Sequence, residues 1–332
     1  MKTDLFIGGG RSILGWTLGI GLFLGLVGIL QVSVGWGALL GPWREFSGGE
    51  LVGALSLVVA SYGLRTIRVH EYFRPETAGR FHHSFRLILL HNLFNNLLPM
   101  RSGEASFPIL MQRNFQVPFS RSIPGLLYLR FLDLHFLLLL GALVLLSGKN
   151  PEGWLVAAFL APLPVAVFLT QEGLRTRVEN RGGLLGRVLA KGLAGLPSTP
   201  GLFWATWGWT VVNWGVKLLV FAWILRAFAP MSLSAALLGS VTGELSSVLP
   251  FHGLAGAGTY EAGVIAGLVP LGVGLESALA GAVNLHLFVL GASVLSGLLA
   301  LALPNGRLSS SPQTPDSSGS AAQETRENDV DS

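Results

Sequence analysis

The stretch HNLFNNLLPMRSGEASF, residues 91–107, gathers three asparagines, a proline, an arginine and a glutamate between leucines. The asparagines fall on one helical face, with His91 at i,i+4 from Asn95, and Pro99 is expected to end the helix. Polar groups at membrane depth normally face protein or a water-filled cavity, and broken helices survive there under the same condition. One interpretation is a pocket lined by half-helices; the other is an interfacial loop in which Arg101 and Glu104 pair only with each other. The candidate polar residues are Asn92, Asn95, Asn96, Arg101 and Glu104.

A second cluster lies in YLRFLDLHF, where Arg130 and Asp133 share one face of a leucine-rich helix at i,i+3 spacing. The pair is a candidate for direct contact with a substrate. The alternative is a self-satisfied ion pair that fixes this helix to its neighbour. Both interpretations remain open.

The third cluster is GELSSVLPFHGLAGAGTYEAG, residues 243–263. Gly256 and Gly258 allow sharp turns and a close approach to a ligand, and a helix restarting at Gly258 would offer free N–H groups to an anion. Glu261 either favours its own helix start or belongs to the site. Glu244 lies among apolar residues and either lines the site or pairs with an arginine of the first cluster.

Several familiar active-site patterns are missing from the sequence. It contains no Walker A loop, no HExxH and no GxSxG, and its seven histidines lack a metal-ligand spacing. It has no cysteine, which excludes disulfides and thiolate chemistry. We therefore predict no catalytic residue, no metal and no cofactor.

The composition indicates a membrane protein. Hydrophobic residues make up 51% of the 332 and charged residues 12%, against about 25% charged in an average soluble domain. Uncharged runs are about as long as the roughly 20 residues that cross a bilayer. The net charge of +4 resides mostly in connections, so we read it as an orientation signal and expect no nucleic-acid partner. The tryptophans at 204, 207, 209 and 214 are interpreted as interfacial and packing residues.

The predicted architecture is an all-α polytopic helical bundle of about eight spanning or re-entrant segments. Arginines concentrate in the connections 65–86 and 172–191 but not in 31–50 or 148–153. By the positive-inside rule both basic connections, and with them both termini, are expected on the cytoplasmic side of the inner membrane. The segments we would draw are 13–33, 50–69, 84–98, 124–147, 154–171, 202–226, 233–250, 260–273 and 277–303.

This orientation forces 84–123 and 233–273 each to return to the side from which it enters. Both segments are interrupted by proline or glycine, so we predict two broken, re-entrant hairpins that enter from opposite faces, as in an inverted repeat. A short echo, SGEAS at 102–106 and TGELS at 242–246, agrees. Residues 1–303 form one membrane domain, and the polar segment 304–332 is expected to be disordered.

Two motifs resemble signatures of a known family. NNLLPMRSGEASFPILMQRNFQVPFSRS followed by LRFLDL resembles the first signature of the lysylphosphatidylglycerol synthetase transmembrane-region family, also called flippase-like. LPFHGLAGAGTYEAG is similar to its second signature. Many members have Pro-Gly-Gly in that turn and an arginine on the last helix, whereas this chain has HGLAGAG, Asn284 and His286, a difference that bears on substrate identity. The matching positions are Asn96, Pro99, Arg101, Gly103, Glu104, Arg130, Asp133, Pro250, Gly253, Gly256, Gly258 and Glu261.

The resemblance implies an inner-membrane protein that moves a lipid or a lipid-linked group between leaflets, without the soluble aminoacyl transferase domain of the full-length synthetases. In that role Arg101 and Arg130 would bind an anionic headgroup with help from N–H groups at Gly258, and Glu104, Glu244 and Asp133 would hold the arginines or engage a cationic group. Two alternatives remain open: an intramembrane transferase acting on a phospholipid or polyprenyl substrate, with Glu104 or Asp133 as base, and a non-transporting partner of an envelope-synthesis enzyme. The sequence does not give the oligomeric state.

Overall fold

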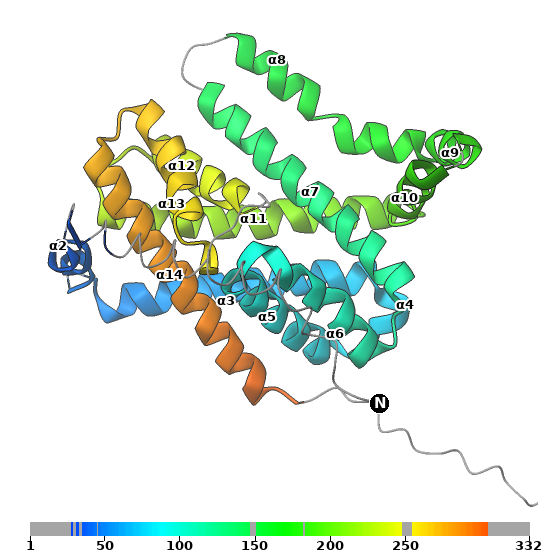
Figure 1. Cartoon of the computed structure of the whole chain (residues 1–332), viewed down its shortest axis with the longest axis horizontal. Helices are drawn as coiled ribbons and strands as arrows, with labels where there is room; N and C mark the ends of the chain where they lie inside the picture. Colours follow the sequence, from blue (N-terminus) through cyan, green and yellow to red (C-terminus); the bar gives the residue numbers. More distant parts are fainter. Residues whose placement is uncertain are drawn as a thin grey trace, which may run out of the picture.

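The computed structural model describes residues 35–44, 46–146, 151–181, 183–247 and 254–304, together with Gly28, Gln31 and Val32. Within these residues all regular elements are helical (Figure 1). Most of the predicted first span at 13–33 and the predicted tail after residue 304 lie outside the described residues, as do Pro250 and Gly253.

Long apolar helices occupy most of the predicted spans. Five segments are long and apolar enough to cross a membrane, which confirms an all-α polytopic membrane protein. They coincide with the predicted spans at 50–69, 124–147, 154–171, 202–226 and 277–303. The helices are α3 (Gly48–Tyr72), α7 (Phe119–Leu146), the consecutive pair α8 (Pro151–Leu160) and α9 (Leu163–Arg181), α11 (Pro200–Phe228) and α14 (Leu275–Ala302).

Local signals explain where two of these helices begin. At the start of α3, the Ser47 hydroxyl accepts a hydrogen bond from the Glu50 N–H at 3.2 Å, and the Glu50 carboxylate accepts one from the Ser47 N–H at 3.0 Å. This capping box satisfies donors that a helix end leaves free. At the start of α11, Thr199 accepts from the Leu202 N–H at 3.3 Å, and Pro200 follows at a position where its missing N–H costs nothing.

The span predicted at 154–171 is bent. A turn at Ala161–Pro162 separates α8 from α9, because proline cannot donate the hydrogen bond that would continue the helix. This pair lies at the periphery of the bundle (Figure 1). Its apolar side chains point outward, with Phe159 and Leu169 exposed by 74% and 73%, as expected of a lipid-facing surface.

The first predicted hairpin is a helix, a break and a second helix. It consists of α5 (Phe81–Leu97), the 3₁₀ turn η2 (Pro99–Ala105) and α6 (Ser106–Phe115). The turn lies directly on the end of α5, since a Cβ on Gly103 would overlap the backbone of Phe94 and Asn95.

The second hairpin has the same form. It consists of α12 (Leu233–Ser246), the 3₁₀ turn η3 (Leu254–Gly256) and α13 (Thr259–Leu268), followed by η4 (Val269–Leu271). In the break, Ala255, Gly256 and Gly258 have φ of 53°, 81° and 83°, and glycine adopts this left-handed region without steric cost. Small residues spaced four apart let the helices α12 and α13 approach closely. They are Gly239 and Gly243 on α12 and Gly263 and Gly267 on α13.

The two halves of the chain repeat one plan, in which a long helix, a broken hairpin and a second long helix follow each other. The first half uses α3, α5–α6 and α7, and the second uses α11, α12–α13 and α14. The helices α3 and α11 pack side by side and run in opposite directions (Figure 1), α5 packs on α14, and α12 packs on α7. The first helix of each hairpin thus packs on the second long helix of the other half, which agrees with the predicted inverted repeat. The helices α8, α9 and α10 (Gly183–Leu193) connect the halves.

The two basic connections meet at one end of the bundle. The Tyr72 hydroxyl, at the end of α3, donates to the Gly195 carbonyl at 2.6 Å. Arg121 donates to the Tyr72 hydroxyl at 3.0 Å and forms an ion pair with Glu76 at 3.3 Å. At the other end of α3, the Trp43 indole donates to Asn284 of α14 at 2.6 Å. Tyr72 lies within the predicted connection 65–86 and Gly195 follows the connection 172–191, so the two connections approach each other at this end of the bundle.

Candidate functional site

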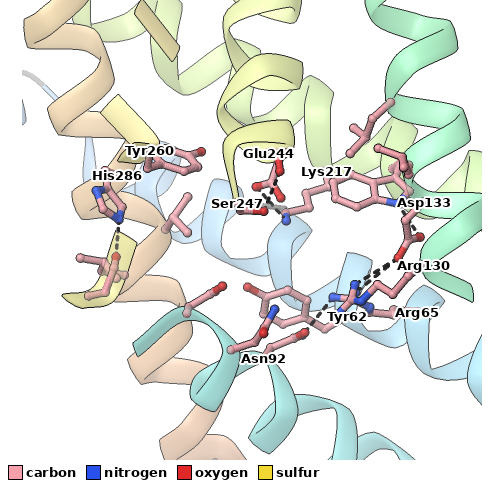
Figure 2. Close-up of a pocket in the computed structure, with 18 of the residues that line it drawn as sticks. Tyr62, Arg65, Asn92, Arg130, Asp133, Lys217, Glu244, Ser247, Tyr260 and His286 are labelled. Atoms are coloured by element: carbon pink, nitrogen blue, oxygen red, sulfur yellow. Dashed lines mark hydrogen bonds and ion pairs between the residues drawn. The ribbon is translucent and has the colours of Figure 1, made fainter. Parts of the chain in front are cut away.

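A cavity of about 320 Å³ lies between the two hairpin breaks, inside the bundle. Helices from both halves contribute to its wall, and charged side chains point into it (Figure 2). The polar and aromatic residues that line it are Tyr62, Arg65, Asn92, Asn95, Asn96, Arg130, Phe131, Asp133, Trp214, Lys217, Glu244, Ser247, Tyr260 and His286.

Asp133 is the centre of an ion-pair network at one end of the cavity. Its carboxylate accepts from the Arg68 guanidinium at 2.6 Å, from the Trp214 indole at 2.8 Å and from Arg130 at 3.1 Å. A nitrogen of Arg65 lies 3.7 Å away. Asp133 is 4% exposed and Arg68 is 1% exposed. The pairing is therefore what makes a charge tolerable at this depth.

Arg130 connects this network to the first break. Its Nη2 lies 2.8 Å from a carboxylate oxygen of Glu104, in η2, and 3.2 Å from Nε2 of His91. A guanidinium only donates, so Nε2 of His91 accepts. The His91 proton must then be on Nδ1, which lies 2.9 Å from the Ser106 hydroxyl. His91 is thus a neutral imidazole that orients Arg130.

Two arginines that we had assigned to a cytoplasmic connection lie inside the bundle. Arg65 lines the cavity and donates to the Asn92 side chain at 2.8 Å, and Arg68 donates to Thr210 of α11 at 2.8 Å. The predicted connection begins too early in the sequence, because α3 continues to Tyr72. Charge in a sequence does not reveal where a helix ends when the charged residues have buried partners.

Glu244 pairs with a lysine of α11. Lys217 Nζ lies 2.9 Å from its carboxylate and 4.7 Å from the centre of the Trp214 ring. Of the two interpretations of Glu244, the structure agrees with a place in the cavity wall, and the alternative partner, an arginine of the first cluster, is replaced by Lys217. Trp214 packs in the core with Leu137 and Leu218, as interpreted, and it also donates to Asp133 and lines the cavity.

At the second break, Glu261 and His286 form a buried pair, with Nδ1 of His286 2.7 Å from Glu261 Oε1. The other carboxylate oxygen accepts from the Gly258 N–H at 2.8 Å. Glu261 therefore caps its own helix and also contacts α14. The Gly258 N–H, which we had predicted to be free for an anion, is already engaged.

Three buried polar atoms at the cavity wall have no hydrogen-bond partner. They are Nδ2 of Asn92, Oδ1 of Asn95 and the hydroxyl of Tyr260. Asn96, by contrast, donates to Ser293 at 2.6 Å. An unpaired buried polar group costs about 1–3 kcal/mol, so each of these three atoms calls for a partner, such as a water molecule or a polar ligand.

The structure brings most of the predicted site residues to one place. Asn92, Asn95, Asn96, Arg130, Asp133 and Glu244 line the cavity. Glu104 acts through Arg130, Gly256 and Gly258 shape the second break, and Glu261 supports His286. The Arg101 side chain lies outside what the structure describes. Seven further residues of the cavity and its ion-pair network had no predicted role in the site. The signal that could have found them is a charged or aromatic side chain within or just beside an apolar run. They are Tyr62, Arg65, Arg68, Trp214, Lys217, Tyr260 and His286.

Metal binding finds no support in the described part of the chain, where no group of three or more His, Asp or Glu side chains is arranged to hold an ion. What remains is a polytopic helical membrane protein with an ion-paired cavity between two broken hairpins. Residues 16–297 match the family model described as lysylphosphatidylglycerol synthase TM region, and the chain belongs to this family. This confirms the family suggested by the two signatures. A search of curated proteins and a search of solved structures each found no match.

Proposed function

We propose that this protein moves a lipid with an anionic headgroup between the leaflets of the plasma membrane. The observation that supports this most directly is an excess of positive charge around the cavity. With the separate Glu261–His286 pair left out of the count, the cations of the described network outnumber its carboxylates by four to three. They are Arg65, Arg68, Arg130 and Lys217 against Glu104, Asp133 and Glu244. One positive charge is left for a ligand.

Arg65 supplies that charge. Its guanidinium donates to Asn92 and lies 3.7 Å from Asp133, beyond the 2.7–3.2 Å of a hydrogen bond. It lines the cavity with Arg130, and two guanidinium groups suit the bidentate recognition of a phosphate. The unpartnered atoms of Asn92, Asn95 and Tyr260 offer two donors and one acceptor for hydroxyl groups of the headgroup.

The location of the cavity favours transport. It lies between the breaks of two hairpins that belong to oppositely oriented halves, as do the binding sites of transporters that alternate access by moving one repeat against the other. We take both hairpins to be re-entrant and both termini to be cytoplasmic, because the basic connections lie together at one end of the bundle.

The enzyme alternative receives less support from the same contacts. Asp133 accepts hydrogen bonds from two arginines and a tryptophan, and Glu104 is paired with Arg130. Carboxylates held by such donors are poor general bases, because abstracting a proton requires a free lone pair and gives up the ion pairing. A role as a non-transporting partner predicts instead that the cavity charges are dispensable.

Reconstituted vesicles test the proposal. Purified protein is placed in liposomes that contain fluorescent phosphatidylglycerol, and the fraction of label protected from an external reductant reports exchange between leaflets. We expect Arg65→Gln and Arg130→Gln to slow exchange, while Arg175→Gln, whose pair with Glu172 is not part of the cavity wall, leaves it unchanged. Exchange that is equally fast in all three variants and the wild type would reject the proposal.

A further inference from the structure

The contacts of Glu261 and His286 require one more proton than a neutral imidazole and a carboxylate carry together. His286 contacts oxygen atoms through both ring nitrogens: Nδ1 is 2.7 Å from Glu261 Oε1, and Nε2 is 2.8 Å from the Ala255 carbonyl. Both residues of the pair are 5% exposed. The contact is therefore largely shielded from bulk water, while His286 also lines the cavity.

Counting hydrogens fixes the protonation state of the pair. A carbonyl oxygen can only accept, so Nε2 of His286 must carry a hydrogen. A neutral imidazole has one such hydrogen, and its Nδ1 would then present a lone pair to a carboxylate oxygen 2.7 Å away. That contact is repulsive, so one further proton must lie between Nδ1 and Oε1. The Gly258 N–H bonds the other oxygen of Glu261 at 2.8 Å and stabilises the carboxylate, which leaves the proton on the imidazole.

His91 shows that this arrangement is particular to the second break. His91 also makes polar contacts through both ring nitrogens, but its Nε2 faces the Arg130 guanidinium, which donates to it. His91 is satisfied as a neutral ring, whereas His286 requires a positive one. The two breaks therefore lie beside histidines of opposite character, His91 on α5 and His286 on α14.

We infer that Glu261 and His286 form a proton-binding site and that the proton moves together with the anionic headgroup. This step rests on the proposed function. Because His286 lines the cavity, release transfers the Nδ1 proton to a cavity water, giving hydronium and leaving neutral imidazole against the Glu261 carboxylate. The pair changes from net neutral to negative, which disfavours a second anion in the same cavity. By linkage, a bound headgroup must favour the proton to the same extent.

Protonation also controls contact between elements. The pair joins η3 through Ala255, the start of α13 through Gly258 and the middle of α14 through His286. Loss of the proton sets two lone pairs against each other and loosens this three-way contact at the break. A bistable element of this kind, biased by a histidine proton, is what a coupled transporter needs.

Other charged groups face the pair from the surrounding helices. Tyr260 of α13 stacks at 4.7 Å on the His286 ring. Glu244 of α12 with Lys217 of α11 forms the next charges along the cavity (Figure 2), and Tyr62 and Arg65 of α3 and the network of Asp133 on α7 follow. The described part of α5 presents asparagines to the cavity. Since Glu244 and Asp133 are already paired with cations, His286 is the cavity group free to exchange a proton without breaking an arginine or lysine pair.

Nitrogen NMR tests the proton site without any transport. Protein with ¹⁵N-labelled histidine is placed in lipid nanodiscs at pH 7, and the His286→Gln variant identifies the signals of His286. We expect both ring nitrogens of His286 to be protonated. His135 is an internal control, because Nε2 faces the Leu160 carbonyl and Nδ1 has no partner, so one protonated nitrogen is expected. An unprotonated Nδ1 in His286 would overturn the inference.

A pH gradient tests the coupling. In liposomes with fluorescent phosphatidylglycerol, a gradient of one pH unit should shift the leaflet distribution by up to about tenfold for one proton per lipid. We expect the His286→Gln and Glu261→Gln variants to lose this shift. Wild-type protein that exchanges lipid with no shift overturns the coupling but leaves the proposed function intact. Wild-type protein that exchanges no lipid rejects the proposed function and the coupling together, and the NMR result then decides the proton site alone.

Discussion

Arg68 and Asp133 form an ion pair in the middle of the bundle, with the guanidinium Nη1 2.6 Å from the carboxylate Oδ1. The pair joins the last third of α3 to the centre of α7, and Thr210 of α11 accepts a further hydrogen bond from Arg68 at 2.8 Å. Three long helices from both halves of the chain thus meet at one buried charge pair. The cavity wall depends on it, because Arg65 and Arg130 are positioned by the same carboxylate.

Asp133→Asn should destabilise the protein strongly. The substitution leaves Arg68, which is 1% exposed, without its counter-charge, and breaking a buried pair in this way typically costs about 3–5 kcal/mol. Unfolding in detergent micelles measures the loss. Glu172→Gln is the matched control, because Glu172 also pairs with an arginine but its side chain is 80% exposed, and exposed pairs contribute little. Equal stability of the two variants would show that the Asp133 network does not hold the bundle together.

The pair of Lys217 and Glu244 should behave as a unit. Lys217→Met leaves a carboxylate unpaired at the cavity wall, and Glu244→Gln leaves an ammonium unpaired, so each single variant should lower the melting temperature. The double variant removes both charges and should recover much of the loss, because the two residues are 2.9 Å apart and are coupled. Strictly additive effects in this cycle would argue against a direct pair.

Tyr260→Phe should lower lipid exchange without lowering the stability of the protein. The Tyr260 hydroxyl is buried without a partner, so its removal should leave the melting temperature equal or higher. If the headgroup supplies the missing partner, lipid exchange should fall by about fivefold, the value of a hydrogen bond of roughly 1 kcal/mol.

Tyr128→Phe is the control for this experiment. The Tyr128 hydroxyl already contacts Thr206 at 2.8 Å and is not part of the cavity wall. Its loss should lower stability by about 1 kcal/mol and leave the transport step unchanged. A Tyr260→Phe protein with normal exchange would remove Tyr260 from the site.

Gly267→Ala should force α12 and α13 apart. A Cβ at this position would overlap Thr242 and the backbone of Leu238, and overpacking of this kind costs about 1–3 kcal/mol. Gly208→Ala in α11 is the matched control, because a Cβ there meets nothing within 4 Å and alanine favours a helix by about 1 kcal/mol. The melting temperature should fall in the first variant and stay level or rise in the second.

The architecture was predictable because it depends on patterns that a membrane imposes locally. Uncharged runs of sufficient length gave the spans, and Pro99 marked the first break. Asn92, Asn95 and Asn96 were predicted to share a face from helical spacing, and they do line one cavity. These inferences required only neighbours in the sequence.

The partners of the charged residues were not predictable, because they are set by packing between distant segments. For Glu244 the only partner considered was an arginine of the first cluster, whereas it pairs with Lys217. Arg65 and Arg68 were counted as loop charges, since their partners Asn92 and Asp133 lie 27 and 65 residues away. His286 was noted only as a departure from the family pattern. Its role became visible once the Ala255 carbonyl and Glu261 were seen on either side of the ring.

The reciprocal packing of the two halves, α5 on α14 and α12 on α7 around the antiparallel pair α3 and α11, bears on the origin of the molecule. A polypeptide of half this length, inserted into a bilayer in both directions, would meet an upside-down copy of itself through the same surfaces. A single gene that encodes both orientations needs a linker that crosses the membrane once, and the α8–α9 segment is long and apolar enough to do so. On this view the ancestor was a dual-topology homodimer, and fusion freed each copy to acquire its own histidine.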